Sequence, residues 1–416
     1  MQKKLIALAV AGLLSGGAFA QSNVTIYGLV DMGIETGNSG FGTQTRFQSG
    51  QSYGNRLGFK GQEDLGGGNA FIFTLESGFA LDNGQATNHG SLTGGASTNN
   101  PPIVNTQANV VNTAAQTGGN FLFGRQAFAG LKGNWGQFTF GRQYEPVFLI
   151  SAATDPFAAG TVGETGNLYQ GLAGFTQRLD NFGWYQTPSI NGLVLAGGYS
   201  TGSEVNLNGV AANTNSNFNG TARTAATRSK KEGQGYALMG TYNNGPLFVG
   251  AGYHDTYIPT NLVAIAGAAT EAAKAKTWNL GATYDFGVIK VYGSYASGKV
   301  TQDGIGGNIQ DTRLWSLSAS YPVGPHKFLA STGAVDDKSV ANKDFKQFGI
   351  GYEYSWSKRT TFYTAWATIK NDDRFTAAGA AAGAGKALNS ASNTAMLTID
   401  GNYDPKALQV GVRHSF

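Results

Sequence analysis

Apolar and polar residues alternate with a period of two along most of this 416-residue chain. In the segment 277–286 the apolar positions are Trp278, Leu280, Ala282, Tyr284 and Phe286. The segments 23–35, 347–354 and 408–416 show the same alternation. A period of two is typical of β-strands that have one apolar and one polar face. The pattern therefore predicts an all-β protein.

The alternation alone does not tell which face of the sheet is buried. In a soluble sandwich the apolar face packs inward, and in a membrane barrel it faces lipid. Three features favour the barrel. Strands of about ten residues suit a tilted bilayer crossing, short and long connections alternate, and aromatic residues gather toward strand ends. The residues expected in such interfacial girdles are Phe79, Tyr185, Tyr253, Trp278, Tyr295, Tyr354 and Phe416.

The connections give the expected number of strands. Short turns are predicted around 64–69, 133–136, 188–192, 243–246, 285–287, 322–325 and 355–358, and long loops around 36–44, 80–119, 144–176, 202–232, 258–275, 299–311, 335–344 and 371–404. Together they join about sixteen strands, an even number that allows an antiparallel barrel to close. The alanine-rich segment 264–276 is compatible with a short helix. The sequence thus predicts a 16-stranded antiparallel transmembrane β-barrel.

Composition narrows the class further. The chain has 62 glycines, 12% aromatic residues and only 13% charged residues. After residue 20 no apolar run approaches the length of a membrane-spanning helix, which excludes a helical membrane protein. The chain has no cysteine, so disulfides, thiol catalysis and zinc–thiolate sites are excluded.

The first twenty residues have the pattern of a secretory signal peptide. Lys3 and Lys4 form the positive region, residues 5–14 are apolar, and Ala18-Phe19-Ala20 is a small-x-small cleavage site. We therefore expect a leader at 1–20 and the barrel at 21–416. Without the two lysines the formal charge falls from +4 to +2, too small a value to indicate a nucleic-acid partner.

No motif for catalysis, metal binding or nucleotide binding is found in the sequence. The four histidines, His89, His254, His326 and His414, have no metal-ligand spacing and are interpreted as isolated loop or girdle residues. The glycine-rich stretch 379–386 departs from a phosphate-binding loop at Ala380 and Ala387. No nucleophile and base can be paired from the sequence. We expect neither enzyme activity nor a cofactor.

Four stretches resemble general diffusion porins of the Gram-negative outer membrane, in particular the β-proteobacterial branch. They are "NVTIYGLVDMGIE" (23–35), "NRLGFKGQEDLGGGNAFIFTLESGF" (55–79), "FGRQAFAGLKGNWGQFTFGRQYEP" (123–146) and the terminal "LQVGVRHSF" (408–416). The resemblance implies a 16-stranded barrel, a homotrimer, and a third long loop that folds into the lumen as a constriction. It also implies that Phe416 is read by the barrel-assembly machinery.

The resemblance also nominates basic residues of the pore constriction. Arg56 matches the arginine of the family's R-x-G-F-K-G strand, Arg125 that of G-R-Q-A-F-x-G-L, and Arg178 the arginine that opens the sixth strand. Lys60 lies on the same strand side as Arg56. The alternation places Arg56 and Lys60 in the lumen, whereas for Arg125 the pattern is ambiguous and only the resemblance places it there.

The acidic wall of the constriction is expected from the third loop, where Asp155 and Glu164 are the acidic residues available. A second arginine of the region, Arg142, has the strand parity of Phe138 and Phe140. Regular alternation therefore points it outward, where an arginine facing lipid costs roughly 2–4 kcal/mol. We expect Arg142 at a subunit interface, unless a bulge at Gly141 turns it inward.

The expected function is passive diffusion of small hydrophilic solutes and ions through a water-filled channel in the Gram-negative outer membrane. Three arginines against two loop acids suggest a weak anion preference. The expected partners are outer-membrane lipid and lipopolysaccharide, the assembly machinery and the solutes themselves. The alternatives are a substrate-specific channel for an organic acid or phosphate, an outer-membrane lipase and a secreted adhesive β-protein. A saturable conductance would favour the first alternative.

Overall fold

The computed structural model describes residues 23–40, 42–84, 86–87, 122–202, 233–258, 273–301, 308–339, 342–372 and 403–416. The elements are β1 (Asn23–Asn38), β2 (Thr43–Ser49), β3 (Arg56–Gly66), β4 (Asn69–Phe79), β5 (Ala86–Thr87), β6 (Gln126–Gly133), β7 (Gly136–Tyr144), α2 (Pro146–Ala153), α3 (Gly166–Tyr169), β8 (Arg178–Gln186), β9 (Leu193–Thr201), β10 (Gln234–Asn244), β11 (Leu247–Ile258), β12 (Ala273–Asp285), β13 (Lys290–Thr301), β14 (Asn308–Val323), β15 (His326–Asp337), β16 (Phe345–Ser355), β17 (Thr360–Asn371) and β18 (Lys406–Ser415). The expected leader lies outside the described residues.

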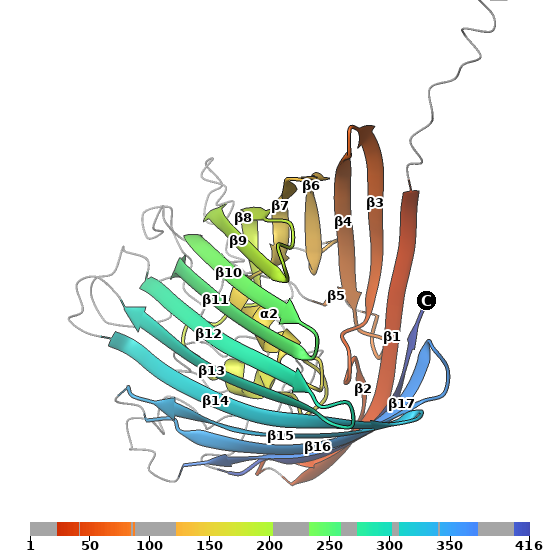
Figure 1. Cartoon of the computed structure of the whole chain (residues 1–416). Helices are drawn as coiled ribbons and strands as arrows, with labels where there is room; N and C mark the ends of the chain where they lie inside the picture. Colours follow the sequence, from red (N-terminus) through yellow and green to blue (C-terminus); the bar gives the residue numbers. More distant parts are fainter. Residues whose placement is uncertain are drawn as a thin grey trace, which may run out of the picture.

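The strands form one closed antiparallel ring (Figure 1). The ring closes where β1 pairs with β18 on one side and with β3 on the other. β2 pairs with the second half of β1, and β5 is a two-residue strand against the end of β4. The other sixteen strands make the wall, as the sequence predicts. Because the ring is closed, its wall of sixteen strands has no terminal edge strand.

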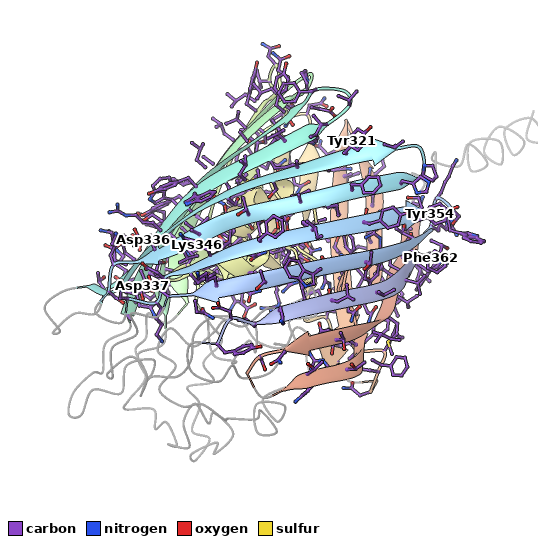
Figure 2. All side chains as sticks on the ribbon, turned by 90° about the horizontal axis from the view of Figure 1, so that it is seen from below. Tyr321, Asp336, Asp337, Lys346, Tyr354 and Phe362 are labelled. Atoms are coloured by element: carbon purple, nitrogen blue, oxygen red, sulfur yellow. The ribbon has the colours of Figure 1, made fainter. Side chains whose placement is uncertain are left out.

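The wall carries apolar side chains on its outer face and polar side chains on its inner face, the reverse of a soluble protein. On β12, Trp278 is 42% and Leu280 50% exposed on the outside, whereas Thr277 and Asn279 are 0% and 1% exposed on the inside. An apolar outer face and a polar inner face are what a barrel in lipid requires. Figure 2 shows the same wall, with Tyr321, Tyr354 and Phe362 near its turn end.

The turns agree with the sequence prediction, but some strands run further at the opposite end. β13 continues to Thr301 and β15 to Asp337, both inside expected loops. β12 begins at Ala273, so residues 273–276 form strand and not the helix suggested by their composition. Lys274 pairs with Thr301 there, which shows that cross-strand pairing outweighs local helix propensity. No helix among the described residues is long and apolar enough to span a membrane.

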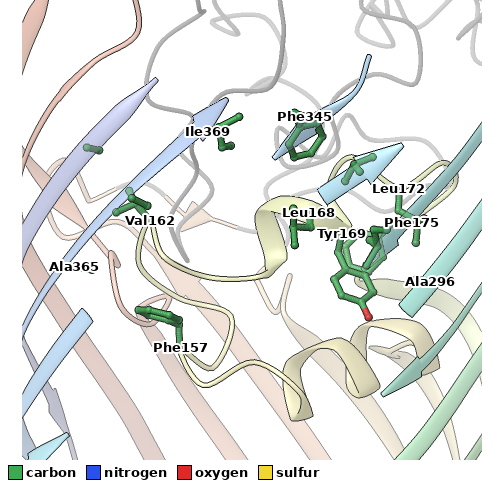
Figure 3. Close-up of a cluster of buried hydrophobic side chains, with 14 of the residues drawn as sticks. Phe157, Val162, Leu168, Tyr169, Leu172, Phe175, Ala296, Phe345, Ala365 and Ile369 are labelled. Atoms are coloured by element: carbon green, nitrogen blue, oxygen red, sulfur yellow. The ribbon is translucent and has the colours of Figure 1, made fainter. Parts of the chain in front are cut away.

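The connection between β7 and β8 folds into the barrel, as expected, and carries both α2 and α3 (Figure 1). Its apolar side chains pack on apolar residues of the inner wall (Figure 3). The loop contributes Val147, Phe157, Val162, Leu168, Tyr169, Leu172 and Phe175, and the wall contributes Ala296, Leu314, Leu329, Val335, Phe345, Ala365, Ala367, Ile369 and Ala407. The barrel interior thus holds an apolar core under this loop.

Hydrogen bonds between backbone groups of the loop and side chains of the wall also hold the constriction loop, defined here as residues 145–177, in place. Val162 N–H donates to Gln409 Oε1 (2.9 Å), and Ala173 N–H donates to Thr312 Oγ1 (2.7 Å). The Ser331 hydroxyl donates to Gly163 O (2.6 Å). Three separate strands therefore hold this loop. The buried backbone groups of an irregular segment find partners in the polar inner face of the barrel.

Candidate functional site: the lumenal constriction

The constriction loop begins at Glu145, directly after β7. The Glu145 carboxylate accepts hydrogen bonds from Val147 N–H (3.0 Å) and Phe148 N–H (2.6 Å), and Pro146 occupies the first turn of α2. An acidic cap followed by proline is a favourable helix start, since proline lacks the N–H that would otherwise need a partner. The sequence thus turns the chain from strand to helix within one residue.

His254 of β11 joins both ends of this loop, which corrects its interpretation as an isolated girdle residue. Its Nδ1 lies 2.9 Å from Glu145 Oε2, and its Nε2 lies 3.0 Å from Gly174 O. The side chains of His254 and Glu145 are both fully buried. The prediction was wrong because the partner lies 109 residues away in the chain, beyond the reach of a local pattern.

The three arginines nominated from the sequence lie together on the inner wall. Tyr144 Oη accepts hydrogen bonds from Nη2 of Arg125 (2.9 Å) and from Nη2 of Arg178 (3.2 Å). Arg56 lies within electrostatic range of both Arg125 and Tyr144. The ambiguous parity of Arg125 has a simple explanation, because β6 begins one residue later at Gln126 and alternation does not apply to Arg125.

An acid that sequence reasoning did not select stands beside these arginines. Glu76 of β4 accepts a hydrogen bond from Arg125 Nε (2.6 Å) and another from the Tyr27 hydroxyl (2.9 Å). Glu76 and Arg125 are both buried. A paired, desolvated acid and arginine fix each other's position, and their charges largely cancel. Arg125 is therefore partly neutralised from within the wall.

Aromatic rings support the arginines. The Arg178 guanidinium carbon lies 4.6 Å from the centroid of the Tyr144 ring, and the other neighbour of that ring is Phe148, stacked at 5.0 Å. Stacking on an aromatic face is favourable for a guanidinium and holds it flat. Lys60, nearer the turn end, is exposed and lies with its Nζ 5.4 Å from the Tyr27 ring centroid.

The two loop acids are both buried, and Asp155 is directed toward its own loop. Asp155 is 5% and Glu164 3% exposed. The Asp155 carboxylate accepts hydrogen bonds from Phe157 N–H (3.1 Å) and Ala159 N–H (3.0 Å). Burial raises the pKa of Asp155 to about 6, although these two hydrogen bonds oppose the rise. Their role as an acidic wall facing the arginines stays a prediction.

Arg142 has a partner charge within the chain. Its Nη1 pairs with Asp180 Oδ1 on β8, and its Nε donates to Gly124 O (2.7 Å). The β7–β8 pairing shifts register at this point, with the extra residue in β8, where Asn181 has a φ of 48°. A bulge is thus present, although the inserted residue is not Gly141. The subunit-interface position of Arg142 stays a prediction.

A further arginine, Arg413 of β18, also reaches the lumen. Its Nη1 donates to Glu353 Oε1 (2.7 Å) and to Ser52 Oγ (2.7 Å), and its guanidinium carbon lies 4.6 Å from the Tyr53 ring centroid. The alternation of the last strand already predicts this inward position of Arg413. Alternation in the last strand places Leu408, Val410 and Val412 outside, and these residues are exposed. Arg413 therefore belongs to the inner face.

Comparisons with known proteins agree with this geometry. The model of the Gram-negative porin family matches residues 7–374. The chain belongs to the Gram-negative porins. Outer membrane porin protein 32 of Delftia acidovorans is 30% identical over the whole of both chains. An outer membrane porin protein of Bordetella pertussis is 28% identical over 89% of this porin and 95% of that protein. These relatives confirm the expected branch.

Solved structures show the same fold. The anion-selective porin from Comamonas acidovorans superposes with a TM-score of 0.69 at 24% identity, covering 95% of this porin and all of that chain. The trimer form of OmpT of Vibrio cholerae gives a TM-score of 0.60 at 14% identity, covering 95% of this porin and 99% of that chain. The protein is thus an outer-membrane porin, whose water-filled barrel lets small hydrophilic solutes diffuse across the Gram-negative outer membrane. Its family consists of channels and not of enzymes.

Proposed function

We propose that this porin is a weakly anion-selective general diffusion channel whose constriction is lined by Arg56, Arg125, Arg178 and Lys60. The observation that carries the proposal is the asymmetry of the charges. The arginines gather on one wall around Tyr144, whereas the Asp155 carboxylate accepts hydrogen bonds from backbone N–H groups of its own loop. A narrow lumen with an excess of one sign of charge concentrates ions of the opposite sign. The anion selectivity of the Comamonas porin, which has the same fold, supports this proposal.

We further propose a homotrimer, embedded in outer-membrane lipid and lipopolysaccharide, with Arg142 near the subunit interface. The trimer form of the Vibrio protein supports the assembly state. After export by the leader at 1–20, Phe416 serves as the signal for the barrel-assembly machinery. Its backbone N–H and carbonyl pair with Gly28 at the seam of the ring (3.0 Å each). The final residue therefore takes part in barrel closure.

Planar-bilayer recording of the purified porin tests both statements. We expect a reversal potential on the anion side in a potassium chloride gradient, and closure in three steps. Cation selectivity of the wild-type channel would contradict the proposed preference. Closure in a single step would contradict the trimer. A conductance that saturates with one organic acid or with phosphate would instead favour the substrate-specific channel.

A further inference from the structure

The first and the last strand of the barrel pair with each other, and this pairing of β1 with β18 is called here the closing seam. Three facing pairs on the lumenal side of the seam are Asp31 and Arg413, Gly33 and Gly411, and Glu35 and Gln409. Asp31, Glu35 and Gln409 are at most 2% exposed. Although the lumen of such a barrel is water-filled, other parts of the chain therefore cover the inside of the seam.

The constriction loop covers the seam at Glu35 and Gln409. The Gln409 side chain uses both ends of its amide, since Nε2 donates to Glu35 Oε2 (2.6 Å) and Oε1 accepts from Val162 N–H (2.9 Å). Glu35 also accepts a hydrogen bond from Arg46 Nη2 (2.7 Å). A buried amide that is bonded at both ends is held in one orientation. One side chain thus connects both strands of the seam with the loop.

The segment 50–53, between β2 and β3, makes a second connection between the seam and the loop. The Asp31 carboxylate accepts hydrogen bonds from three successive N–H groups of this segment (3.0–3.1 Å) and from the Tyr363 hydroxyl of β17 (2.6 Å). On its other side the segment meets the loop, because Gln51 O accepts a hydrogen bond from Thr161 N–H (2.5 Å). The segment is therefore bonded to the seam and to the loop at the same time.

Glycines allow these parts to approach closely. A Cβ at Gly160 of the loop would lie 1.5 Å from Ser52 O, a backbone atom that cannot rotate away. On the seam, a Cβ at Gly411 would lie 2.3 Å from Tyr363 Oη. Side chains larger than hydrogen at these two positions would push the covering segments away from the wall. The loop is thus fitted to the inside of the seam by shape as well as by hydrogen bonds.

The backbone of the loop is strained where it meets the seam. The loop tip, defined here as residues 157–162, has positive φ angles at Ala158 (53°), Ala159 (56°) and Thr161 (61°). This region is disfavoured for residues with a Cβ, and most of all for a β-branched residue such as threonine. Strained conformations persist where the surrounding structure imposes them. The contacts with the seam and with segment 50–53 supply that constraint.

We propose that the loop tip and the closing seam form one cooperative unit, in which Glu35 and Gln409 are positioning residues of the pore constriction. The closed seam holds the tip in its strained shape, and the docked tip holds β1 and β18 together from the lumenal side. Such a coupling is reciprocal, so weakening either part must loosen the other. The constriction loop thereby gains a role in barrel closure, which is independent of any ion selectivity.

Hydrogen exchange of backbone amides, followed by mass spectrometry on the whole porin in detergent, tests the coupling from the loop side. Gly160→Ala places a Cβ against the facing backbone and should displace the tip. We expect exchange in 29–36 and 407–415 to become at least ~3-fold faster, while β13 and β14 keep the wild-type rate. The matched control is Gly298→Ala, which disturbs the same loop at Ala173 and should leave the seam unchanged.

The same measurement tests the coupling from the seam side. Glu35→Leu removes the acceptor that orients Gln409 and alters no residue of the loop. Exchange within the tip should become faster by a similar factor, because the coupling is reciprocal. Glu35→Gln keeps a side-chain oxygen that accepts from Gln409, so it should restore the wild-type rate in the tip. A role of Glu35 confined to strand pairing would leave the tip unchanged in both variants.

Three results would overturn the cooperative unit. The first is faster exchange in the tip of Gly160→Ala with wild-type exchange in the seam. The second is equal seam exchange in Gly160→Ala and Gly298→Ala, which would assign the effect to any disturbance of the loop. The third is wild-type exchange in the tip of Glu35→Leu. Heat-modifiable migration in gels shows which variants fold, and if Gly160→Ala does not, the two Glu35 variants decide.

Discussion

His254 and Glu145 form a fully buried contact, with Nδ1 2.9 Å from Oε2, that joins the barrel wall to the start of the constriction loop. The other ring nitrogen faces Gly174 O at the far end of the loop. A carbonyl oxygen only accepts, and an ionised carboxylate also only accepts. Each of the two contacts therefore needs a proton of its own. One proton lies on Nε2 and faces Gly174 O, and the other lies between Nδ1 and Glu145 Oε2. A single side chain thus fastens both ends of the loop.

Replacing His254 by Phe should loosen the constriction loop while the barrel still forms. The variant keeps an aromatic ring but removes the contacts of His254 with Glu145 and with Gly174 O, a cost of about 3–5 kcal/mol for the broken buried pair. We expect noisier open-channel current and faster proteolysis within 145–177. His414→Phe is the matched control, because His414 is exposed and bonds only Thr360 among the described residues (2.9 Å). Equal current noise in the two variants would contradict the role of His254 in fastening the constriction loop.

The anion preference should depend on pH through Asp155. Because burial raises the pKa of Asp155 to about 6, this carboxyl is ionised at neutral pH and becomes protonated as the pH falls through that value. Loss of a negative charge in the loop favours anions. We expect the anion-to-cation permeability ratio to rise between pH 7 and pH 5. Asp155→Asn should flatten this part of the profile, and an unchanged profile in that variant would assign the effect to another group.

The sequence predicts the barrel well because its signals are local and repeated. Alternation along each strand fixes the inner and outer faces, as on β12, and turn residues fix one end of every hairpin. The opposite ends are less predictable. The strand at 273–276 exists because Lys274 and its neighbours pair with β13, and no local propensity reveals that pairing.

The constriction is predictable only in part, for a physical reason. Arg56 and Arg413 follow from alternation, since both lie on regular strands. Arg125 lies just before its strand and needed the family resemblance. The contacts of Glu76 and His254 join segments 49 and 109 residues apart, so no periodic pattern contains them. Closure of the barrel, and not local sequence, brings these groups together.

Glycines on the inner wall should prove necessary for seating the constriction loop. A Cβ at Gly298 of β13 would collide with the backbone of Ala173 in the loop, whereas a Cβ at Gly293 on the same strand has only Ser316 O at 3.9 Å nearby. Gly298→Ala should displace the loop at a cost of about 1–3 kcal/mol. We expect altered conductance for Gly298→Ala and wild-type conductance for Gly293→Ala. Equal conductance of the two variants would show that the loop adapts without cost.

The ion pair between Arg142 and Asp180 should stabilise the bulged β7–β8 hairpin. Both side chains are largely shielded, at 10% and 25% exposure, so removing one partner leaves a poorly solvated charge. Arg142→Gln and Asp180→Asn should each lower the unfolding free energy in lipid by about 3–5 kcal/mol, the range for breaking a buried pair. The double variant should cost clearly less than the sum of the two. Urea unfolding in lipid vesicles, followed by tryptophan fluorescence, measures this coupling.

The same two variants also test whether Arg142 lies at the subunit interface, as expected from the sequence. If Arg142 also contacts a neighbouring subunit, Arg142→Gln should lower the temperature at which trimers dissociate in detergent gels by more than Asp180→Asn does. Asp180→Asn is the matched control, because it breaks the intrachain pair and keeps the arginine. Equal shifts in the two variants would assign Arg142 to the hairpin alone. In that case the bulge explains why an arginine with outward strand parity is tolerated in the barrel wall.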